Sequence, residues 1–351
     1  MDFAIGQRHA REILGRQGLQ IEAALAGLNL QALLFEVQTN LGTVRQRTQD
    51  VLQLACANRH CAVAFVRSDG CGRRNLDFKL NEVPRFWFGG DPFITRMFDA
   101  LSLTFPDGER YFIQSVRLFR EQITDPDLKQ RVAEFIGQEA QHGIAHDKMN
   151  QVMKEQGMPV DQFIQRLNKI FKFELEKRSP QYNIAMTAAA EHLTALMAET
   201  FYSHKETLRD AHPYVRALFA WHAIEEMEHR DVAFDVMKQV GNVPESTRKF
   251  VLVWTTALMF GFTLYRANVM LKHDGFSSLQ RLQMNIRGLP WFFGRKGTLS
   301  KMSKQYRDWF KKDFHPSQHP VIAQYDVWVK TLQQTGDPIQ AGEAFWQAAK
   351  D

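Results

Sequence analysis

The chain has 351 residues, 44% of them hydrophobic, and a formal net charge of +5, so it is long and apolar enough to bury the core of one large domain or two. Its three cysteines, Cys56, Cys61 and Cys71, have spacings that match no zinc or redox motif, which excludes the common cysteine-based sites. The N-terminus has no basic start followed by an apolar run, which excludes a cleavable signal peptide of the usual kind. We therefore expect a reduced, cytoplasmic protein.

The first 78 residues differ in composition from the rest of the chain. They contain no Lys, Pro or Trp, but they hold every Cys and many Arg and Gln. Because the composition changes near Asn75, we divide the chain into an N-terminal extension of uncertain status, residues 1–73, and a working domain, residues 74–351. The extension is an appended unit, a flexible segment or upstream translation outside the working protein, and we expect it to be dispensable.

The working domain is expected to be a series of helices separated by Pro and Gly. Pro126 and Pro180 stand at predicted helix starts, a position that Pro favours, and no segment shows the sustained alternation that strands require. Residues 250–265, the longest uncharged apolar stretch, number 16; this is shorter than the ~20 needed to cross a membrane, so we expect a buried helix. The expected helices are one starting near Phe93, one carrying Glu109, one opening at Pro126, and then Val160–Lys177, Ile184–Tyr202, Val215–Val240, Phe250–Tyr265, Val321–Gln334 and Pro338–Lys350.

Two of these helices carry paired acidic and imidazole side chains. At about 100° of rotation per residue, His222, Glu226 and His229 fall within a roughly 60° arc of one helix face. An earlier stretch offers Glu139 and His142 on one face in the same way. Each helix therefore presents a Glu-x-x-His pair.

Two such pairs, with one further Glu from each of two other helices, form the ligand set of ferritin-like carboxylate bundles that bind two metal ions. Glu109 and Glu191 supply the two missing carboxylates, both in apolar helical surroundings. Burying these groups without compensation would cost several kcal/mol each, and a pair of divalent metals would compensate them. We therefore predict an all-α, ferritin-like four-helix bundle with additional C-terminal helices. Its predicted metal ligands, which are also the predicted catalytic residues, are Glu109, Glu139, His142, Glu191, His222, Glu226 and His229.

His222 is an addition to the usual pattern. The position four residues before the last Glu is normally not a ligand, so His222 either binds metal as a seventh ligand, which we favour, or hydrogen-bonds a ligand carboxylate. His146 is expected to support a ligand through a hydrogen bond, with a packed or exposed imidazole as the alternative. Glu225 is expected at the solvated surface or in the same supporting role, and Glu228 and His192 are expected at the solvated surface.

The chain resembles the bacterial family labelled "predicted metal-dependent hydrolase" over about residues 74–330. The order of the ligands, with a His four residues before the last Glu, is also similar to that of the p-aminobenzoate N-oxygenase type of di-iron enzyme, a likeness of spacing alone. Residues 1–73 match neither. The first resemblance rests on residues 77–87, Gly90-Asp91-Pro92, residues 101–110 (LSLTFPDGER), residues 137–142 (GQEAQH) and residues 221–229 (WHAIEEMEH).

The two resemblances imply different reactions. A hydrolase would use two metals to activate water against an ester, amide or phosphate, whereas an oxygenase would use two ferrous ions to reduce dioxygen. A carboxylate-rich, His-poor ligand set suits iron or manganese better than zinc, which prefers His and Cys. We therefore expect two divalent ions, iron first and manganese or zinc as alternatives, in an oxygen-activating oxidoreductase, with a two-metal hydrolase second. A metal-storage or binding protein is the third alternative, which the third His and the long C-terminal extension disfavour.

Partners are expected on three grounds. Phe and Met side chains along the ligand helices favour a small apolar or aromatic substrate, although plain core packing is the alternative for most of them. The lack of rubredoxin-like Cys pairs means that an oxygenase would need a separate electron donor. Residues 246–315 carry 13 Lys and Arg against 3 Asp, a net charge of +10, and such segments with interleaved aromatic residues bind anionic membrane surfaces. We expect peripheral contact with the inner face of the membrane, with a solvated basic segment as the alternative, and no nucleic acid, because no binding motif accompanies the charge. The interleaved aromatic residues are Trp291, Phe292, Phe293, Trp309, Phe310 and Phe314.

Overall fold

The computed structural model describes residue 74 and residues 76–350 of the chain. Every described residue belongs to one compact unit of the chain. The predicted N-terminal extension, residues 1–73 with the three cysteines, lies outside the described residues.

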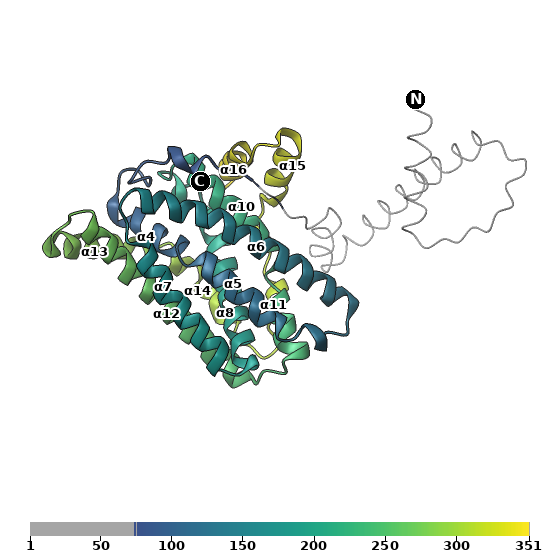
Figure 1. Cartoon of the computed structure of the whole chain (residues 1–351). Coiled ribbons are helices and arrows are strands. Elements are labelled where there is room, and N and C mark those ends of the chain that lie inside the picture. Colours follow the sequence, from purple (N-terminus) through teal and green to yellow (C-terminus); the bar gives the residue numbers. More distant parts are fainter. Residues whose placement is uncertain (1–73, 75, 351) are drawn as a thin grey trace, which may run out of the picture. The chain divides into compact units, whose positions relative to one another are not determined.

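The described part of the chain is all-α, which confirms the predicted fold class (Figure 1). Its residues form no β-strand, only two isolated bridge pairs. The helices are α4 (Pro92–Ser102), α5 (Phe105–Arg117), α6 (Pro126–Glu155), α7 (Val160–Lys177), α8 (Pro180–Tyr202), α9 (Lys205–Leu208), α10 (Pro213–His229), α11 (Val232–Asp235), α12 (Glu245–His273), α13 (Ser278–Phe293), α14 (Ser303–Asp308), α15 (Tyr325–Thr335) and α16 (Pro338–Gln347).

The helices begin where the sequence places capping residues. Asp125 caps α6 and Ser179 caps α8, each by accepting a hydrogen bond from a backbone N–H of the first turn. A Pro follows each cap, where its missing N–H costs nothing because that group has no partner within the helix. The bounds of α7 are those predicted, and α8 begins four residues before the predicted start.

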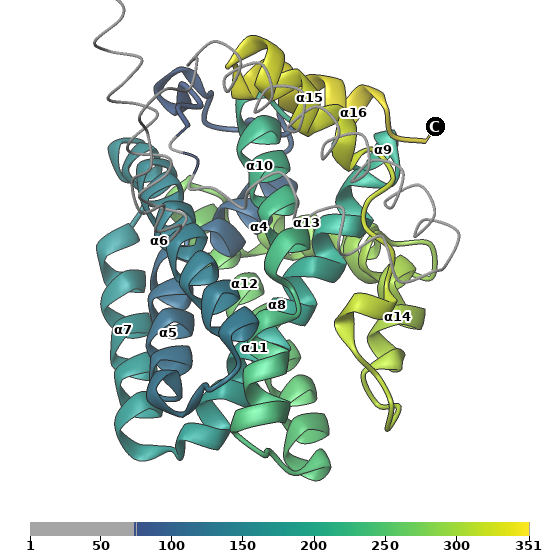
Figure 2. The same ribbon diagram turned by 90° about the vertical axis from the view of Figure 1, so that its right-hand side faces the viewer.

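The helices that carry the predicted ligands meet in the interior of the molecule. Nearly every residue of α8 from Asn183 onward, and of α10 from Val215 onward, is buried. α5 packs against α6 and α8, and α10 packs against α8 and α6 (Figure 2). The four helices therefore enclose a common interior, and the assignment of this arrangement to the ferritin-like bundles stays a prediction.

The helix predicted over residues 215–240 is interrupted. α10 ends at His229, the last predicted ligand. The chain then continues as α11 and as a π-helical turn over residues 236–240. In the break, the Arg230 guanidinium donates a hydrogen bond of 2.6 Å to the backbone carbonyl of His319. This contact joins positions far apart in the sequence, so local periodicity could not reveal it.

The prediction that residues 250–265 form a buried helix is wrong in its burial. These residues lie in α12, a helix long and apolar enough to cross a membrane, yet only 33% of its most apolar window is buried. Phe250 and Trp254 are 61% and 43% exposed. One face of α12 packs against α4 and α8, and the opposite face carries these exposed side chains.

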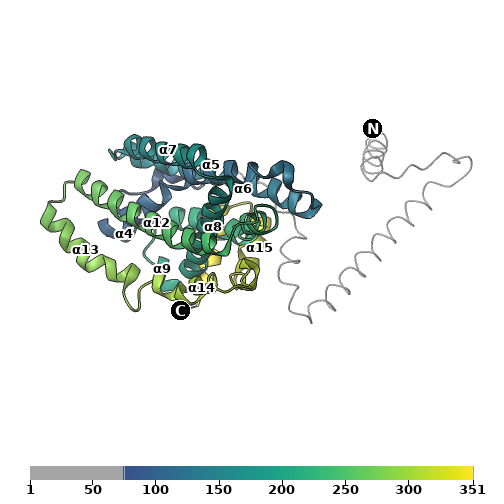
Figure 3. The ribbon, with the colours of Figure 1, turned by 90° about the horizontal axis from the view of Figure 1, so that it is seen from below.

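The basic, aromatic segment also differs from expectation. Residues 278–293, for which no helix was predicted, form α13, which lies beside α12 at one edge of the described fold (Figure 3). Three of the aromatic side chains predicted to be interleaved with exposed charge, Phe292, Trp309 and Phe314, are buried. Phe292 packs against Phe93 and Phe98 of α4, and Trp309 and Phe314 pack against His192 of α8.

Candidate metal centre

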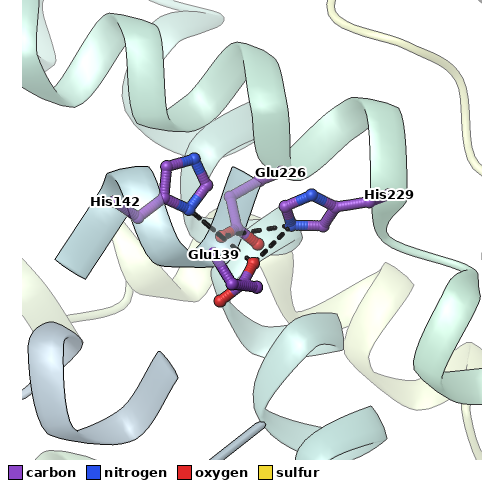
Figure 4. A group of neighbouring side chains, drawn as sticks. All are labelled: Glu139, His142, Glu226 and His229. Carbon is purple, nitrogen blue, oxygen red and sulfur yellow. Dashed lines mark ion pairs between the residues drawn. The ribbon is translucent and has the colours of Figure 1, made fainter. Parts of the chain in front are cut away.

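Six of the predicted ligands converge on one buried space. Glu139 and His142 come from α6, and Glu226 and His229 from α10, and these four side chains point toward one another (Figure 4). Their ligand atoms can be chosen within 4.8 Å of one another. The Nε2 atom of His229 lies 3.0 Å from Oε1 of Glu139 and 3.7 Å from Oε1 of Glu226.

The two isolated carboxylates, Glu109 from α5 and Glu191 from α8, reach the same space. Oε2 of Glu191 lies 3.4 Å from Nε2 of His229. Oε1 of Glu109 lies 3.9 Å from Nε2 of His222, and Glu109, His142 and His222 form a second group with ligand atoms within 4.8 Å of one another. The two groups share His142, so the side chains surround two adjacent positions.

Many of the polar atoms in this space have no hydrogen-bond partner. Both carboxylate oxygens of Glu109, Glu139 and Glu191 are buried without one. The same holds for Nδ1 of His142 and for Nε2 of His229, whose 3.0 Å approach to Oε1 of Glu139 lacks hydrogen-bond geometry. Leaving so many buried acceptors unpaired would be strongly destabilising. Divalent metal ions would satisfy all of them at once, so the residues present fit a metal pair.

Burial and mutual repulsion shift the pKa values of these groups. Burial, followed by the neighbouring carboxylates, raises the pKa of Glu109 and of Glu191 well above the usual range. Burial and the adjacent His222 lower the pKa of His142 to about 3. The imidazole is therefore neutral, the form in which it binds metals, and the carboxylates require added positive charge to ionise together.

The outward-facing nitrogen of each ligand imidazole is held by a hydrogen bond. Nε2 of His142 lies 3.1 Å from Oε2 of Glu225, and Nδ1 of His229 lies 3.0 Å from Oε1 of Gln138. Such partners fix the orientation and tautomer of a ligand imidazole. They leave Nδ1 of His142 and Nε2 of His229 facing the metal positions.

Arg74 links these two supports. Its guanidinium donates to Glu225 at 2.9 Å and to Glu228 at 2.9 Å. Glu228 in turn accepts a hydrogen bond of 2.6 Å from the Gln138 amide, and Glu225 accepts one of 2.7 Å from the Trp221 indole. Sequence reasoning missed Arg74, Gln138 and Trp221 in this role.

The expectation that Glu225 and Glu228 lie at the solvated surface is wrong. The Glu225 side chain is fully buried and that of Glu228 is 3% exposed. The expectation fails because α10 is buried on all sides, so its residues outside the ligand arc face protein. Glu225 instead hydrogen-bonds the ligand imidazole of His142, which was the alternative expected for it.

His222 and His146 form a second chain of hydrogen bonds. Nε2 of His222 lies 2.8 Å from Oε1 of Glu226, and its Nδ1 lies 2.8 Å from Nε2 of His146. Nδ1 of His146 lies 2.8 Å from the Ser102 hydroxyl. In this arrangement His222 contacts a ligand carboxylate, and its role as a seventh ligand stays a prediction.

His192 lies outside the centre. It was expected at the solvated surface, but it is 1% exposed. Its ring centroid lies 4.8 Å from that of Trp309, and burial, with His319 nearby, lowers its pKa to about 3. The expected exposure is therefore wrong, because the C-terminal part of the domain covers this face of α8.

Thr194 on α8 connects the centre to two cavities. Its hydroxyl donates a hydrogen bond of 2.5 Å to Oε2 of Glu226. Thr194 lines both a cavity of about 30 Å³ beside His222 and Glu226 and a larger one of about 100 Å³ between α5, α7, α8 and α12. The metal positions therefore lie next to mainly apolar space.

Comparison with known proteins identifies the family. Neither the curated proteins nor the solved structures include a significant match to this sequence. The family model described as "Predicted metal-dependent hydrolase" matches residues 72–320, a range that includes every predicted ligand and more than half of the chain. The chain therefore belongs to the family of predicted metal-dependent hydrolases.

Proposed function

We propose that the chain is a two-metal enzyme and that its metals are iron ions used to activate dioxygen against an apolar substrate. The observation that carries this proposal is the set of buried, unpartnered atoms shared by Glu109, Glu139 and Glu191 together with one nitrogen each of His142 and His229. Glu226 completes the set, since its Oε1 atom lies 3.7 Å from Nε2 of His229.

The donor atoms favour iron. Four carboxylates and two imidazoles give an oxygen-rich set, whereas structural zinc sites prefer Cys and His in closed tetrahedral geometry. Manganese shares the preference for carboxylates. A pair of ferrous ions supplies the electrons for dioxygen reduction when it is bound, and a separate electron donor would be required to renew them.

The protein contributes orientation and exclusion of water. Arg74, through Glu225 and Glu228, holds the supports of both ligand imidazoles, and Thr194 fixes one oxygen of Glu226. Every predicted ligand is at most 4% exposed. A dry, preorganised site of this kind protects reactive chemistry from solvent and from side reactions.

Hydrolysis is the second candidate, and the family description favours it. In that reaction the same ligands would hold two metals that lower the pKa of a bound water and polarise an ester, amide or phosphate. The apolar lining of the space beside the centre disfavours bulk water, which is the reason for preferring oxidation.

Metal loading distinguishes the two candidates. The metal-free protein would be loaded anaerobically with ferrous iron, manganese or zinc, and bound metal would be counted by elemental analysis. We expect about two ions per chain, and we expect only the iron form to consume dioxygen, measured with an oxygen electrode. An iron form inert toward dioxygen, together with cleavage of chromogenic esters by the zinc or manganese form, would overturn oxidation in favour of hydrolysis.

A further inference from the structure

The larger cavity has almost entirely apolar walls and lies directly behind two metal-binding helices. Gly108 of α5 and Ala190 of α8 line it, and each is the residue immediately before a predicted ligand, Glu109 or Glu191. The far wall comes from α7 and α12, including Leu258. A chamber of about 100 Å³ with such walls suits a hydrocarbon group.

Arg266 of α12 brings a charge into this apolar wall. It lines the cavity and is 4% exposed. Its Nη1 donates a hydrogen bond of 2.7 Å to the Thr104 hydroxyl, although a guanidinium has five N–H groups to donate. Among the described residues, no carboxylate lies within ion-pair distance of Arg266.

The other charged groups near the cavity are already paired. Glu174, the remaining charged residue of the wall, lies 3.3 Å from Arg178. Asp107 acts on Arg266 through its charge. Its Oδ1 is bound at 2.6 Å by Arg110, and its Oδ2 has no hydrogen-bond partner. Burial therefore dominates and lowers the pKa of Arg266 to about 10. The Thr104 hydroxyl and the Phe262 ring, whose centroid lies 5.6 Å from the guanidinium carbon, do not neutralise the charge. A buried cation without a carboxylate partner is unfavourable for folding, so its presence in a cavity wall points to an anion that binds there.

We propose that this cavity binds an aliphatic carboxylic acid, whose hydrocarbon chain fills the apolar chamber and whose carboxylate pairs with Arg266. A guanidinium offers two parallel N–H groups that match the two oxygens of a carboxylate. The Thr104 hydroxyl lies beside it and provides a second donor. The single cationic side chain with one adjacent hydroxyl selects a monoanion.

The volume of the cavity determines how much of the ligand's hydrocarbon chain it can enclose. A cavity of about 150 Å³ holds benzene, so this one encloses a few carbon atoms. Phe262 lines the cavity and is also 36% exposed, so the cavity wall reaches the protein surface at this side chain. The ring centroid of Phe262 also lies 5.6 Å from the guanidinium carbon of Arg266, so this opening is at the charged end of the cavity.

The identification of this ligand as the substrate rests on the proposed function, but its binding does not. Binding would therefore be measured by calorimetry with decanoate and with decanol, its uncharged counterpart, on both metal-free and iron-loaded protein. We expect decanoate to bind at least about tenfold more tightly than decanol, because only decanoate makes the charged hydrogen bonds. Decanoate binding by a protein inert toward dioxygen and esters would uphold this site and reject the proposed function.

Two pairs of variants test the two parts of the site. Arg266→Met should weaken decanoate about tenfold or more and leave decanol unchanged, whereas Arg287→Met removes the same charge from the exposed surface of α13 and should change neither. Leu258→Trp fills the chamber and should abolish binding of both ligands. Ala257→Trp places the same side chain at the neighbouring exposed position and should leave both intact.

Thermal melting separates a binding role from a structural one. If Arg266 serves the ligand, Arg266→Met should melt at the same or a higher temperature without ligand, because a buried unpaired charge has been removed. A lower melting temperature with unchanged decanoate affinity would overturn the proposal. Equal affinity of the natural protein for decanoate and decanol would also overturn it, as would unchanged decanoate binding in Leu258→Trp.

Discussion

The two sides of α5 and α8 face opposite chemical environments. On one side, Glu109 and Glu191 project into a space crowded with carboxylates and imidazoles. On the other, their immediate neighbours Gly108 and Ala190 line a nearly apolar cavity. A step of one residue turns a helix by about 100°, which is enough to change a side chain from one environment to the other.

The comparison shows how a single layer of helices can separate a polar centre from an apolar cavity, which are the two environments that the proposed enzyme would require. The polar side keeps many buried acceptors unpaired, which a protein tolerates only where a ligand will satisfy them. On the apolar side, among the described residues that line the cavity, Oγ1 of Thr255 is the buried side-chain atom without a hydrogen-bond partner, and Arg266 is the buried cation. Small residues beside the ligands keep the cavity close to the centre, because larger side chains would fill it.

Removing a carboxylate that lies between the metal positions should have the largest effect, because the polar side would lose its ability to bind two ions. For Glu139→Ala or Glu226→Ala we expect metal content to fall from two ions toward one or none, because each carboxylate lies near ligand atoms from the other helix. Elemental analysis after loading measures the effect. Glu155→Ala, an exposed substitution on α6, is the matched control, and unchanged stoichiometry in both ligand variants would refute the site.

The Glu-x-x-His pairs could be predicted from the sequence because they depend only on helical rotation. Glu109 and Glu191 could be predicted once the bundle pattern was recognised, since each precedes a pair by a similar interval. Arg74 could not be, because it meets Glu225 and Glu228 across about 150 positions of sequence. Long-range pairings of this kind depend on how helices pack, which periodicity does not report.

The errors in the sequence prediction have a shared physical origin. Glu225 was expected at the surface because helices usually have a solvated face, but α10 has none. The stretch from residue 250 to 265 was expected to be buried because it is uncharged, but α12 leaves one apolar face exposed. In both cases the burial of side chains was predicted from their polarity, but it depends on which neighbouring elements pack against the helix.

Loss of Arg74 should weaken metal binding without removing a ligand. For Arg74→Ala we expect the dissociation constant for metal to rise about 10- to 100-fold, as is typical when the hydrogen-bonded support of a ligand is lost. Competition with a metal chelator measures this change. Arg166→Ala, an exposed arginine on α7, should have no effect, and an equal metal affinity in the two variants would show that Arg74 only stabilises the fold.

Replacement of His222 should have a smaller effect on metal content. For His222→Ala we expect the metals to be retained, because six ligands remain, but the rate of oxygen consumption to change, because Oε1 of Glu226 loses its 2.8 Å hydrogen bond. Metal analysis and an oxygen electrode provide the two readouts. His273→Ala at the exposed end of α12 is the control. Complete loss of metal in His222→Ala would instead rank His222 with the essential ligands.

The weakest expected effect concerns the outer face of α12, which continues the apolar side of the comparison to the surface. We propose that this face and α13 rest on an anionic lipid surface. Phe250 and Trp254 are exposed on α12, and Leu282 and Ile286 on α13, while residues 246–315 carry the net charge of +10. Each Lys or Arg close to such a surface contributes about 1 kcal/mol, so a few are enough for reversible binding.

Co-sedimentation with liposomes that contain acidic lipid tests this contact. We expect the protein to sediment at low salt and to be released at high salt, because the attraction is screened. Trp254→Glu on the outer face of α12 should reduce binding, whereas Leu118→Glu, at a side chain 45% exposed and outside these two helices, should not. Charge reversal at Arg295, Lys296, Lys311 and Lys312 should reduce it further.

A protein that stays in solution at low salt, or that binds equally well after these changes, would show that the exposed face of α12 has another role. Because Phe262 belongs to both this face and the cavity wall, lipid binding would place the cavity beside a source of aliphatic acids.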